Sequence, residues 1–378
     1  MIDTVIIEVP KNKMSTSDVQ SWRLESTGKG WRKLVKNTTT AEKEGGLASI
    51  KLTWYKRADK TGSPIEGVRI EFSVAKLING NNLTELEDKD FLIAIKILRE
   101  RLLKMGEDVS EQDIENASVY SFHPAKNFVL TDGYTASSVI RDLAKINVNK
   151  KFDLTSVTFA NDGSSLQIRT KSHSITFYDK IADGKKDEKR AIDKDQSPQQ
   201  RSLFDEIKKD QPALEILRLE VRLSEKRKMR EVMKKLGFAS SPTFKDVFQR
   251  DVCQKIVGWY WEEIIKGENL FLFELINSPK RLLRKIVRNH KIKAKHAVFL
   301  VGLSVLCKDD GGIRELRELL KQTTKQRNWY TLTKSIELLN GITNKKSLHS
   351  WVQQIDDGIS RFEALKLSTG DVNNSKVS

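Results

Sequence analysis

The chain has 378 residues, of which 67 are Lys or Arg and 51 are Asp or Glu, so its formal net charge is +16. Such a basic chain favours a polyanionic partner, and we expect DNA ahead of an anionic membrane surface. Its apolar runs are shorter than the roughly 20 residues that span a bilayer, and the N-terminus lacks the basic segment and cleavage site of a signal peptide. Only Cys253 and Cys307 are cysteines, which predicts buried thiols in a reducing cytoplasm.

The N-terminal half is predicted to consist of strands with inserted helices. Alternating or β-rich runs predict strands at 1–10, 68–74, 118–122, 155–159, 166–169, 174–178 and 217–223. Helical periodicity predicts helices at 88–105 and 135–146, the second capped by Thr135 or by 131–132. Pro124 is expected to end the strand at 118–122. Residues 184–200 are polar and predict a long loop or a solvated helix, and no internal repeat is expected.

Beyond residue 223 the pattern becomes helical. A basic helix is predicted over 224–236 and is ended by Gly237, and Ser240–Pro242 is expected to form a junction and an N-cap. Helical periodicity then continues to about residue 365. These patterns predict an α+β fold, with an antiparallel-sheet domain and packed helices over 1–235, a mostly helical domain over 236–366 and a disordered tail over 367–378.

Two alternating segments have polar faces with candidate catalytic and metal-binding residues. In 174–180, Tyr178 shares a face with Thr176, opposite an apolar face. A tyrosine hydroxyl can attack a DNA phosphate when a cation and a metal assist it. In 217–223, Glu220 lies between Arg218 and Arg222, which suits a divalent-metal ligand flanked by phosphate-binding arginines. A strand-end tyrosine with a solvated hydroxyl and a salt-bridge ladder would give the same two patterns.

His123 is a third candidate, at the predicted end of the strand 118–122. Imidazole binds divalent metals when carboxylates complete the shell, although a lone histidine on a sheet rim fits equally well. Alternation places His123 on one strand face with Val119 and Ser121. Lys126 and Lys180, close to His123 and Tyr178 in sequence, are candidates for phosphate contacts.

A second basic segment lies over 281–295 and contains no acid. On a helix its positive residues would share one face that could follow a DNA backbone: Arg281, Arg284, Lys285 and Arg288. A solvated basic face is the simpler alternative, and a membrane-bound helix is disfavoured because large aromatics are missing from its apolar side. The run Trp259–Trp261 is expected to be core, with a base-stacking platform as the alternative. No phosphate-binding P-loop, Gly-x-Ser-x-Gly or His-Glu-x-x-His motif occurs.

The order of several of these segments resembles the gene II/X family of phage and plasmid replication proteins. The likeness lies in the opening 1–5, in 72–82, in 122–128, in the tyrosine strand 175–180 and in the Arg-x-Glu-x-Arg strand 217–223. It covers roughly residues 1–235. One departure is clear, since many members have Arg-x-Asp on the middle strand where this chain has Ser121-Phe122-His123, and no His-hydrophobe-His motif is present.

The resemblance implies a nuclease-like domain of the HUH-like class that nicks and rejoins DNA to initiate rolling-circle replication. Tyr178 would form a 5′-phosphotyrosine, His123 and Glu220 would hold Mg²⁺ or Mn²⁺, and Arg218, Arg222, Lys126 and Lys180 would position phosphates. The expected partner is a replication origin, single-stranded or supercoiled, and a host helicase is a further expected partner because the chain has no ATPase motif. Alternatives are a non-catalytic DNA-binding replication regulator, or a relaxase or transposase with the same chemistry.

Overall fold

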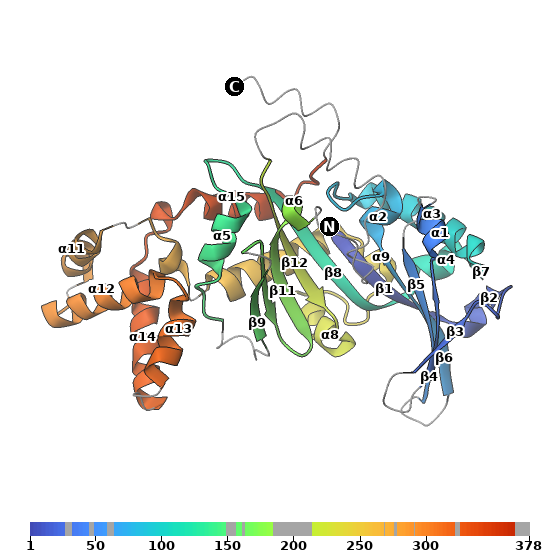
Figure 1. Cartoon of the computed structure of the whole chain (residues 1–378), viewed down its shortest axis with the longest axis horizontal. Coiled ribbons are helices and arrows are strands. Elements are labelled where there is room, and N and C mark those ends of the chain that lie inside the picture. The colour runs from blue at the N-terminus through green and yellow to red at the C-terminus, as the bar shows by residue number, and fades with distance from the viewer. Residues whose placement is uncertain are drawn as a thin grey trace, which may run out of the picture.

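A computed structural model describes residues 1–26, 32–44, 49–58, 64–148, 156–160, 163–183, 214–267, 269–275, 278–290, 292–321 and 326–366. Its central feature is a ten-stranded sheet in the order β3-β4-β5-β6-β1-β8-β12-β11-β10-β9. Every neighbouring pair of these strands is antiparallel. Figure 1 shows the sheet crossing the molecule with β1 and β8 near its middle. The prediction of an α+β fold with a large antiparallel sheet is therefore confirmed.

The strands of this sheet are β1 (Ile2–Pro10), β3 (Arg23–Ser26), β4 (Arg32–Asn37), β5 (Ile50–Ala58), β6 (Pro64–Ser73), β8 (Ser118–Val129), β9 (Ser156–Ala160), β10 (Ser165–Arg169), β11 (His173–Asp179) and β12 (Ile216–Leu223). A small second sheet pairs β2 (Met14–Thr16) with β7 (Glu107–Val109). The described helices that precede β12 are α1 (Thr40–Glu44), α2 (Val74–Asn79), α3 (Phe91–Lys104), α4 (Glu111–Glu115), α5 (Ala136–Leu143) and α6 (Lys180–Asp183).

The helices after β12 are α8 (Lys226–Lys235), α9 (Phe244–Val247), α10 (Arg250–Trp259), α11 (Pro279–His290), α12 (Ala294–Lys308), α13 (Gly312–Lys321), α14 (Gln326–Ile342) and α15 (Ser350–Arg361). A π-helical segment, Tyr260–Lys266, continues α10. Short 3₁₀ turns lie at Lys11–Lys13, Asp88–Asp90, Leu270–Phe273 and Lys345–Ser347. In the predicted core run, Tyr260 and Trp261 are buried, as expected.

The alternation predicted for β11 and β12 is confirmed. Ile175 and Phe177 on β11, and the apolar residues of β12, are buried in the main hydrophobic cluster. That cluster also contains residues of α2, α3, α5, α8, α9, α10 and α15, so these helices pack on the apolar face of the sheet. Tyr178 and Glu220 therefore point away from the helices, because successive side chains of a strand alternate between the two faces.

The strand β8 differs from its prediction. It runs through Pro124 to Val129 instead of ending at Phe122. Proline lacks a backbone N–H, but the β1–β8 register shifts between the pairs Ile2–Pro124 and Val5–Phe122, so the ladder is already irregular there. A second shift lies between the pairs of Ser121 and Val119 and breaks the predicted alternation. Val119 and Phe122 are consequently both in the core, and His123 lies inside a strand instead of at its end.

The predicted helix ends are largely confirmed. Thr135 caps α5 by accepting a hydrogen bond from the Ser138 backbone. Gly237 follows α8 with a φ of 82°, a left-handed conformation that favours glycine at a helix end. The cap after the predicted junction is Thr243, whose hydroxyl accepts from the Asp246 backbone, and not a residue of 240–242.

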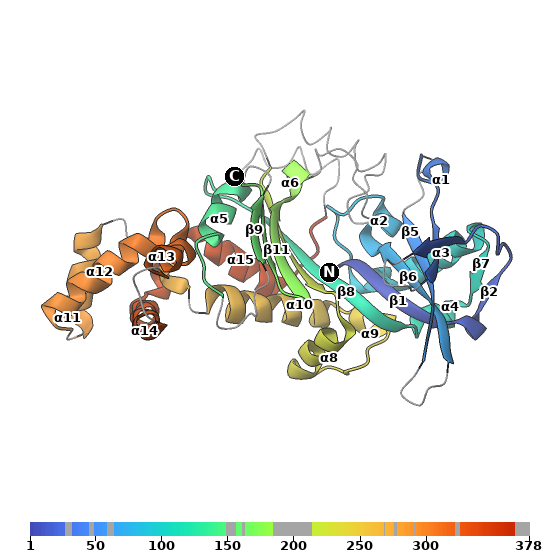
Figure 2. The same ribbon diagram turned by 60° about the horizontal axis from the view of Figure 1, so that its bottom comes forward.

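The helices after residue 236 fall into two groups. The helices α9, α10 and α15 contact β8 and complete the core beneath the sheet, whereas α11–α14 extend to one side (Figure 2). The hydrophobic cluster is continuous across the predicted boundary at residue 235. The predictions for 184–200 and for the tail 367–378 lie outside the described residues. Among the described residues, no helix is both long and apolar enough to cross a membrane.

The sheet consists of two halves with the same topology, which the sequence pattern did not reveal. In each half a central strand, β1 or β8, is followed by a four-stranded meander whose last strand returns beside it: β3-β4-β5-β6 or β9-β10-β11-β12. Helices follow the last strand in both halves, α2 after β6 and α8 after β12. The two central strands pair antiparallel with one another. This arrangement is that of two repeats related by a pseudo-twofold axis between β1 and β8.

The residue registers support the repeat. Aligning Tyr55 of β5 with Tyr178 of β11 aligns the segment Leu-Thr-Trp-Tyr, 52–55, with Ile-Thr-Phe-Tyr, 175–178. The observed strand pairings then match Arg69 with Glu220 and Glu8 with Ala125. Three residues before Glu8 and Ala125, the same alignment matches Val5 with Phe122. A twofold axis between β1 and β8 requires two such equivalent residues to pair with one another, and Val5 and Phe122 do pair.

Candidate active site on the polar face of the sheet

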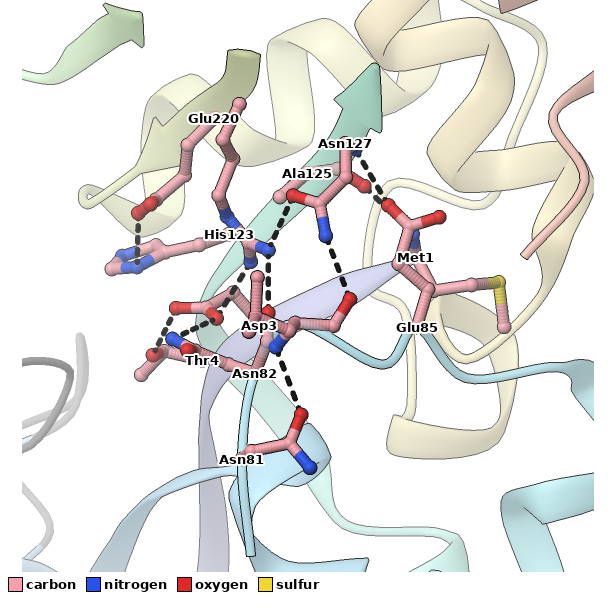
Figure 3. Close-up of polar contacts among 12 residues, drawn as sticks. Met1, Asp3, Thr4, Asn81, Asn82, Glu85, His123, Ala125, Asn127 and Glu220 are labelled. Atoms are coloured by element: carbon pink, nitrogen blue, oxygen red, sulfur yellow. Dashed lines mark hydrogen bonds and ion pairs between the residues drawn. The ribbon is translucent and has the colours of Figure 1, made fainter. Parts of the chain in front are cut away.

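Three sequence-predicted residues meet on the polar face of three adjacent strands. The Tyr178 hydroxyl of β11 donates to Glu220 Oε2 of β12 over 3.4 Å. His123 Nδ1 of β8 lies 3.5 Å from Glu220 Oε1, and Arg222 Nε lies 2.8 Å from the same oxygen. Tyr178 pairs in register with Arg218, so Glu220 is its diagonal neighbour, within reach of a long side chain. Figure 3 shows the side chains of His123 and Glu220 directed toward one another.

Arg218 is the centre of a second group beside the first. One guanidinium nitrogen lies 2.7 Å from Asp3 Oδ1, and the other donates to the Asn82 carbonyl over 3.1 Å and to Asn127 Oδ1 over 3.0 Å. Asn82 also donates to Asp3 Oδ1 over 3.3 Å (Figure 3). Burial raises the pKa of the Asp3 carboxyl, but the charges of Arg218 and Lys180 outweigh burial and hold this pKa well below its ordinary value.

The surroundings of the Tyr178 hydroxyl shift its pKa strongly. Tyr178 is 9% exposed and Glu220 is 1% exposed. Burial raises the pKa of the Tyr178 phenol well above its ordinary value; Arg218 lowers this pKa, and the Glu220 charge raises it further. A change that neutralises Glu220 would therefore lower the pKa of the Tyr178 phenol, and the charge of Arg218 already favours the phenolate.

The two predicted lysines are both buried. Burial lowers the pKa of the Lys180 ammonium to about 8, with the Arg218 charge acting in the same direction and Asp183 opposing it. The Lys180 ammonium lies 5.5 Å from the centre of the Tyr178 ring. Lys126 lies 2.5 Å from Glu85 Oε2 and donates to the Glu363 carbonyl over 2.9 Å. Lys180 therefore belongs to the group around Tyr178, whereas the charge of Lys126 is paired with that of Glu85.

The predicted basic face of α11 lies elsewhere. Arg281, Arg284 and Arg288 are exposed, and Lys285 contacts Glu274 Oε1 at 2.6 Å. Figures 1 and 2 place α11 at the far end of the molecule from β1. The described structure thus does not bring these residues to the group around Tyr178, and the prediction that they bind DNA stays a prediction.

A divalent metal can be tested against the donors present. His123 Nδ1 and Glu220 Oε1 are 3.5 Å apart, a separation that two ligands of one ion can have. Arg222 competes for the same carboxylate oxygen, and the described residues contain no group of three or more His, Cys, Asp or Glu side chains suited to a metal. Of the described residues, His123 and Glu220 would supply two ligands, and phosphate oxygens and water could complete the shell, as is common for Mg²⁺.

Sequence reasoning missed the residues that hold Arg218 in place. Asp3, Asn82 and Asn127 come from β1, the loop after α2 and β8, and all three are buried. The signal available was weak: Asn82 and Asn127 lie in the segments 72–82 and 122–128 that resemble the gene II/X family, but only the β1–β8–β12 pairing brings them together.

Comparison with known proteins gives no identification: no family model matches the chain, and neither a curated protein nor a solved structure matches it.

Proposed function

We propose that the protein is a DNA nicking and joining endonuclease that initiates rolling-circle replication of a phage or plasmid. The observation that carries the proposal is the convergence of Tyr178, Glu220 and His123, from three strands, within 3.5 Å contacts. Phosphodiester transfer to tyrosine needs a nucleophile, a carboxylate and an imidazole beside positive charge, which two arginines supply here. The net charge of +16 suits a DNA substrate, and the resemblance to the gene II/X family supplies the reaction.

In this reaction the Tyr178 oxygen bonds to the scissile phosphorus, and the bond from phosphorus to the 3′ oxygen breaks. The phenolic proton passes toward Glu220 Oε2, which already accepts its hydrogen bond, and the departing 3′ oxygen takes a proton from water. Arg222 and Arg218 supply positive charge beside the phosphate and the phenolate. Mg²⁺ or Mn²⁺ held by His123 and Glu220 would neutralise charge at the phosphate. Rejoining reverses these steps.

The direct test is formation of a covalent adduct. The full chain is incubated with Mg²⁺ or Mn²⁺ and a supercoiled plasmid carrying the cognate origin, and the products are separated under denaturing conditions. We expect nicked circles and a protein band that carries DNA, with the nucleotide on the peptide containing Tyr178. Nicked circles whose ends are both free of protein would contradict the tyrosine mechanism.

A second function is favoured by one observation, the burial of the Tyr178 hydroxyl and its raised pKa. A non-catalytic DNA-binding replication regulator on the same scaffold would keep the tyrosine as a buried hydrogen-bond donor. It would bind DNA in a salt-dependent manner but would give neither nicks nor an adduct in the experiment above.

A further inference from the structure

The repeat in the sheet places a second tyrosine in the position equivalent to Tyr178. Tyr55 of β5 pairs with Gly67 of β6, as Tyr178 pairs with Arg218. A Cβ atom at Gly67 would lie 2.7 Å from the Tyr55 hydroxyl, so glycine is needed for the ring to lie across β6. The first half thus keeps the tyrosine and gives it the space that Arg218 fills in the second half.

The other functional positions are changed in a consistent way. Arg69 stands at the position of Glu220, and Ile6 at the position of His123, so both proposed metal ligands are absent from the equivalent positions. Arg69 replaces a carboxylate with a permanent cation, since guanidinium does not lose its proton in proteins. A site with arginine in place of a metal-binding glutamate can hold a phosphate but cannot bind a divalent cation in the same way.

The local contacts show an aromatic and cationic surface. The Arg69 guanidinium lies 3.6 Å from the ring centre of Tyr120 and 4.9 Å from that of Tyr55. Its Nε lies 3.0 Å from Glu8 Oε1, and Lys226 lies 2.7 Å from Glu8 Oε2. Two cations therefore share one carboxylate, and the Arg69 side chain is 26% exposed. Stacked arginine and tyrosine rings on a polar sheet face suit a nucleic-acid strand.

We propose that the first half of the sheet is a catalytically inactive copy of the tyrosine site, which binds the backbone of the same DNA strand that the second half cleaves. The proposal rests on the proposed function. It explains why the tyrosine is kept while the metal ligands are lost, since a holding site needs positive charge and stacking but no nucleophile activation.

Binding without cleavage tests this proposal. In a Tyr178→Phe background, affinity for a fluorescent single strand of mixed sequence is measured by anisotropy over a salt series. We expect Arg69→Gln to weaken binding about tenfold and to reduce the salt slope by about one unit. Arg99→Gln is the matched control, because Arg99 lies on α3 and is a partly exposed, ion-paired arginine; its binding should match that of the background.

Failure of this proposal is distinguishable from failure of the proposed function. A chain that nicks DNA but binds equally well with Arg69→Gln and Arg99→Gln overturns the holding site alone. A chain that binds no DNA overturns both. Since loss of Arg69 leaves Glu8 paired with Lys226, thermal unfolding of each variant checks that lost binding does not reflect lost folding.

A different observation carries a second inference. The helix α12 is apolar on both faces. Its buried face, with residues such as Ala297, Leu300 and Cys307, packs in the core, while its other face exposes Val298 by 60%, Phe299 by 43%, Val305 by 49% and Leu306 by 54%. A helix that is apolar all round is ordinarily covered on all sides.

The exposed face is symmetric about Gly302. Val298 and Phe299 stand four and three residues before this glycine, and Leu306 and Val305 stand four and three residues after it. In an antiparallel pair of α12 helices crossing at Gly302, Val298 of each would meet Leu306 of the other, and Phe299 would meet Val305. The exposed Lys295 and Asp309, seven residues on either side, would then face one another with opposite charge. A Cβ at Gly302 has no neighbour within 4 Å, so two helices can approach closely there.

We infer that this α12 face binds a second copy of the chain in an antiparallel, twofold-symmetric contact. The sign of the charges favours this occupant, because the face is complementary to itself only when reversed. The test uses Gly302→Cys, since the two native cysteines are buried. We expect a disulfide-linked dimer on oxidation and a dimer mass by light scattering, whereas Gly341→Cys on α14, another open glycine, should not cross-link.

Three results would overturn the inference: a monomer at all concentrations, equal cross-linking at both glycines, or binding to anionic vesicles without dimer formation. A charge-swap pair separates the dimer from non-specific association. Lys295→Asp alone is expected to weaken the dimer several-fold, and the double variant with Asp309→Lys is expected to restore it.

Discussion

Tyr178→Phe is expected to abolish nicking, with a loss of at least about 10³-fold, because the variant has no oxygen that can bond to the phosphorus. The covalent adduct should disappear with it, while affinity for DNA should change little, since within the described part of the chain the hydroxyl makes a single hydrogen bond, 3.4 Å long, to Glu220. The measurement is conversion of supercoiled plasmid to nicked circles, with the adduct detected under denaturing conditions.

The repeat provides the matched control for this prediction. Tyr55→Phe removes the equivalent hydroxyl from the first half of the sheet, where Arg69 and Ile6 replace the proposed metal ligands. Phenylalanine keeps the ring that lies beside Arg69 in the proposed holding site and lacks only the hydroxyl. We therefore expect this variant to bind DNA as before and to nick it at nearly the rate of the unaltered chain. If Tyr178→Phe nicks fully and Tyr55→Phe does not nick, the reactive tyrosine lies in the first half of the sheet. If both variants nick as the unaltered chain does, neither tyrosine is the nucleophile.

The two halves of the sheet also show which parts of the fold could be predicted from the sequence. The alternation in 174–178 and 217–223 was enough to place Tyr178 and Glu220 on polar faces, because the period of two is a local property of a strand. The convergence of these residues depends on the pairing of β8 with β12 and of β12 with β11. That pairing is set by packing across many residues, and no local pattern specifies it.

His123 illustrates a feature that local rules misjudge. The proline after it predicted a strand end, but the missing N–H of Pro124 falls where the β1–β8 register already shifts. The strand therefore continues, and His123 lies beside Glu220. The repeat was also missed, because equivalent positions keep apolar character and not identity, as in Trp54 and Phe177, while the charges at Arg69 and Glu220 are reversed.

The largest expected effect on stability is at Arg218. Arg218→Met leaves the Asp3 carboxylate buried without its main cationic partner, since Asp3 is 1% exposed. Breaking a buried ion pair on one side costs about 3–5 kcal/mol, because the remaining charge is uncompensated. The free energy of unfolding, measured by urea denaturation at neutral pH, should fall by about this amount.

A second substitution distinguishes this cause from a packing defect. In Arg218→Met, Asp3→Asn removes the unpaired charge, so the double variant should recover part of the lost stability, although Asp3→Asn alone should destabilise the unaltered chain. A double variant no more stable than Arg218→Met would show that shape, and not the charge of Asp3, sets the cost.

The pH dependence of this difference follows from the Asp3 pKa. In the unaltered chain this pKa lies below its ordinary value of 3.8, so Asp3 contributes stability above that pH and loses the contribution as the pH falls. Without Arg218, we expect burial to outweigh the remaining charges, chiefly that of Lys180, and to raise the Asp3 pKa above 3.8. The variant should then gain stability relative to neutral pH as the carboxyl takes up a proton. The gap between the two chains should therefore be widest near pH 7 and shrink toward pH 4. A gap that stays constant over this range would contradict the assignment of Arg218 as the group that keeps Asp3 ionised beside the Tyr178 site.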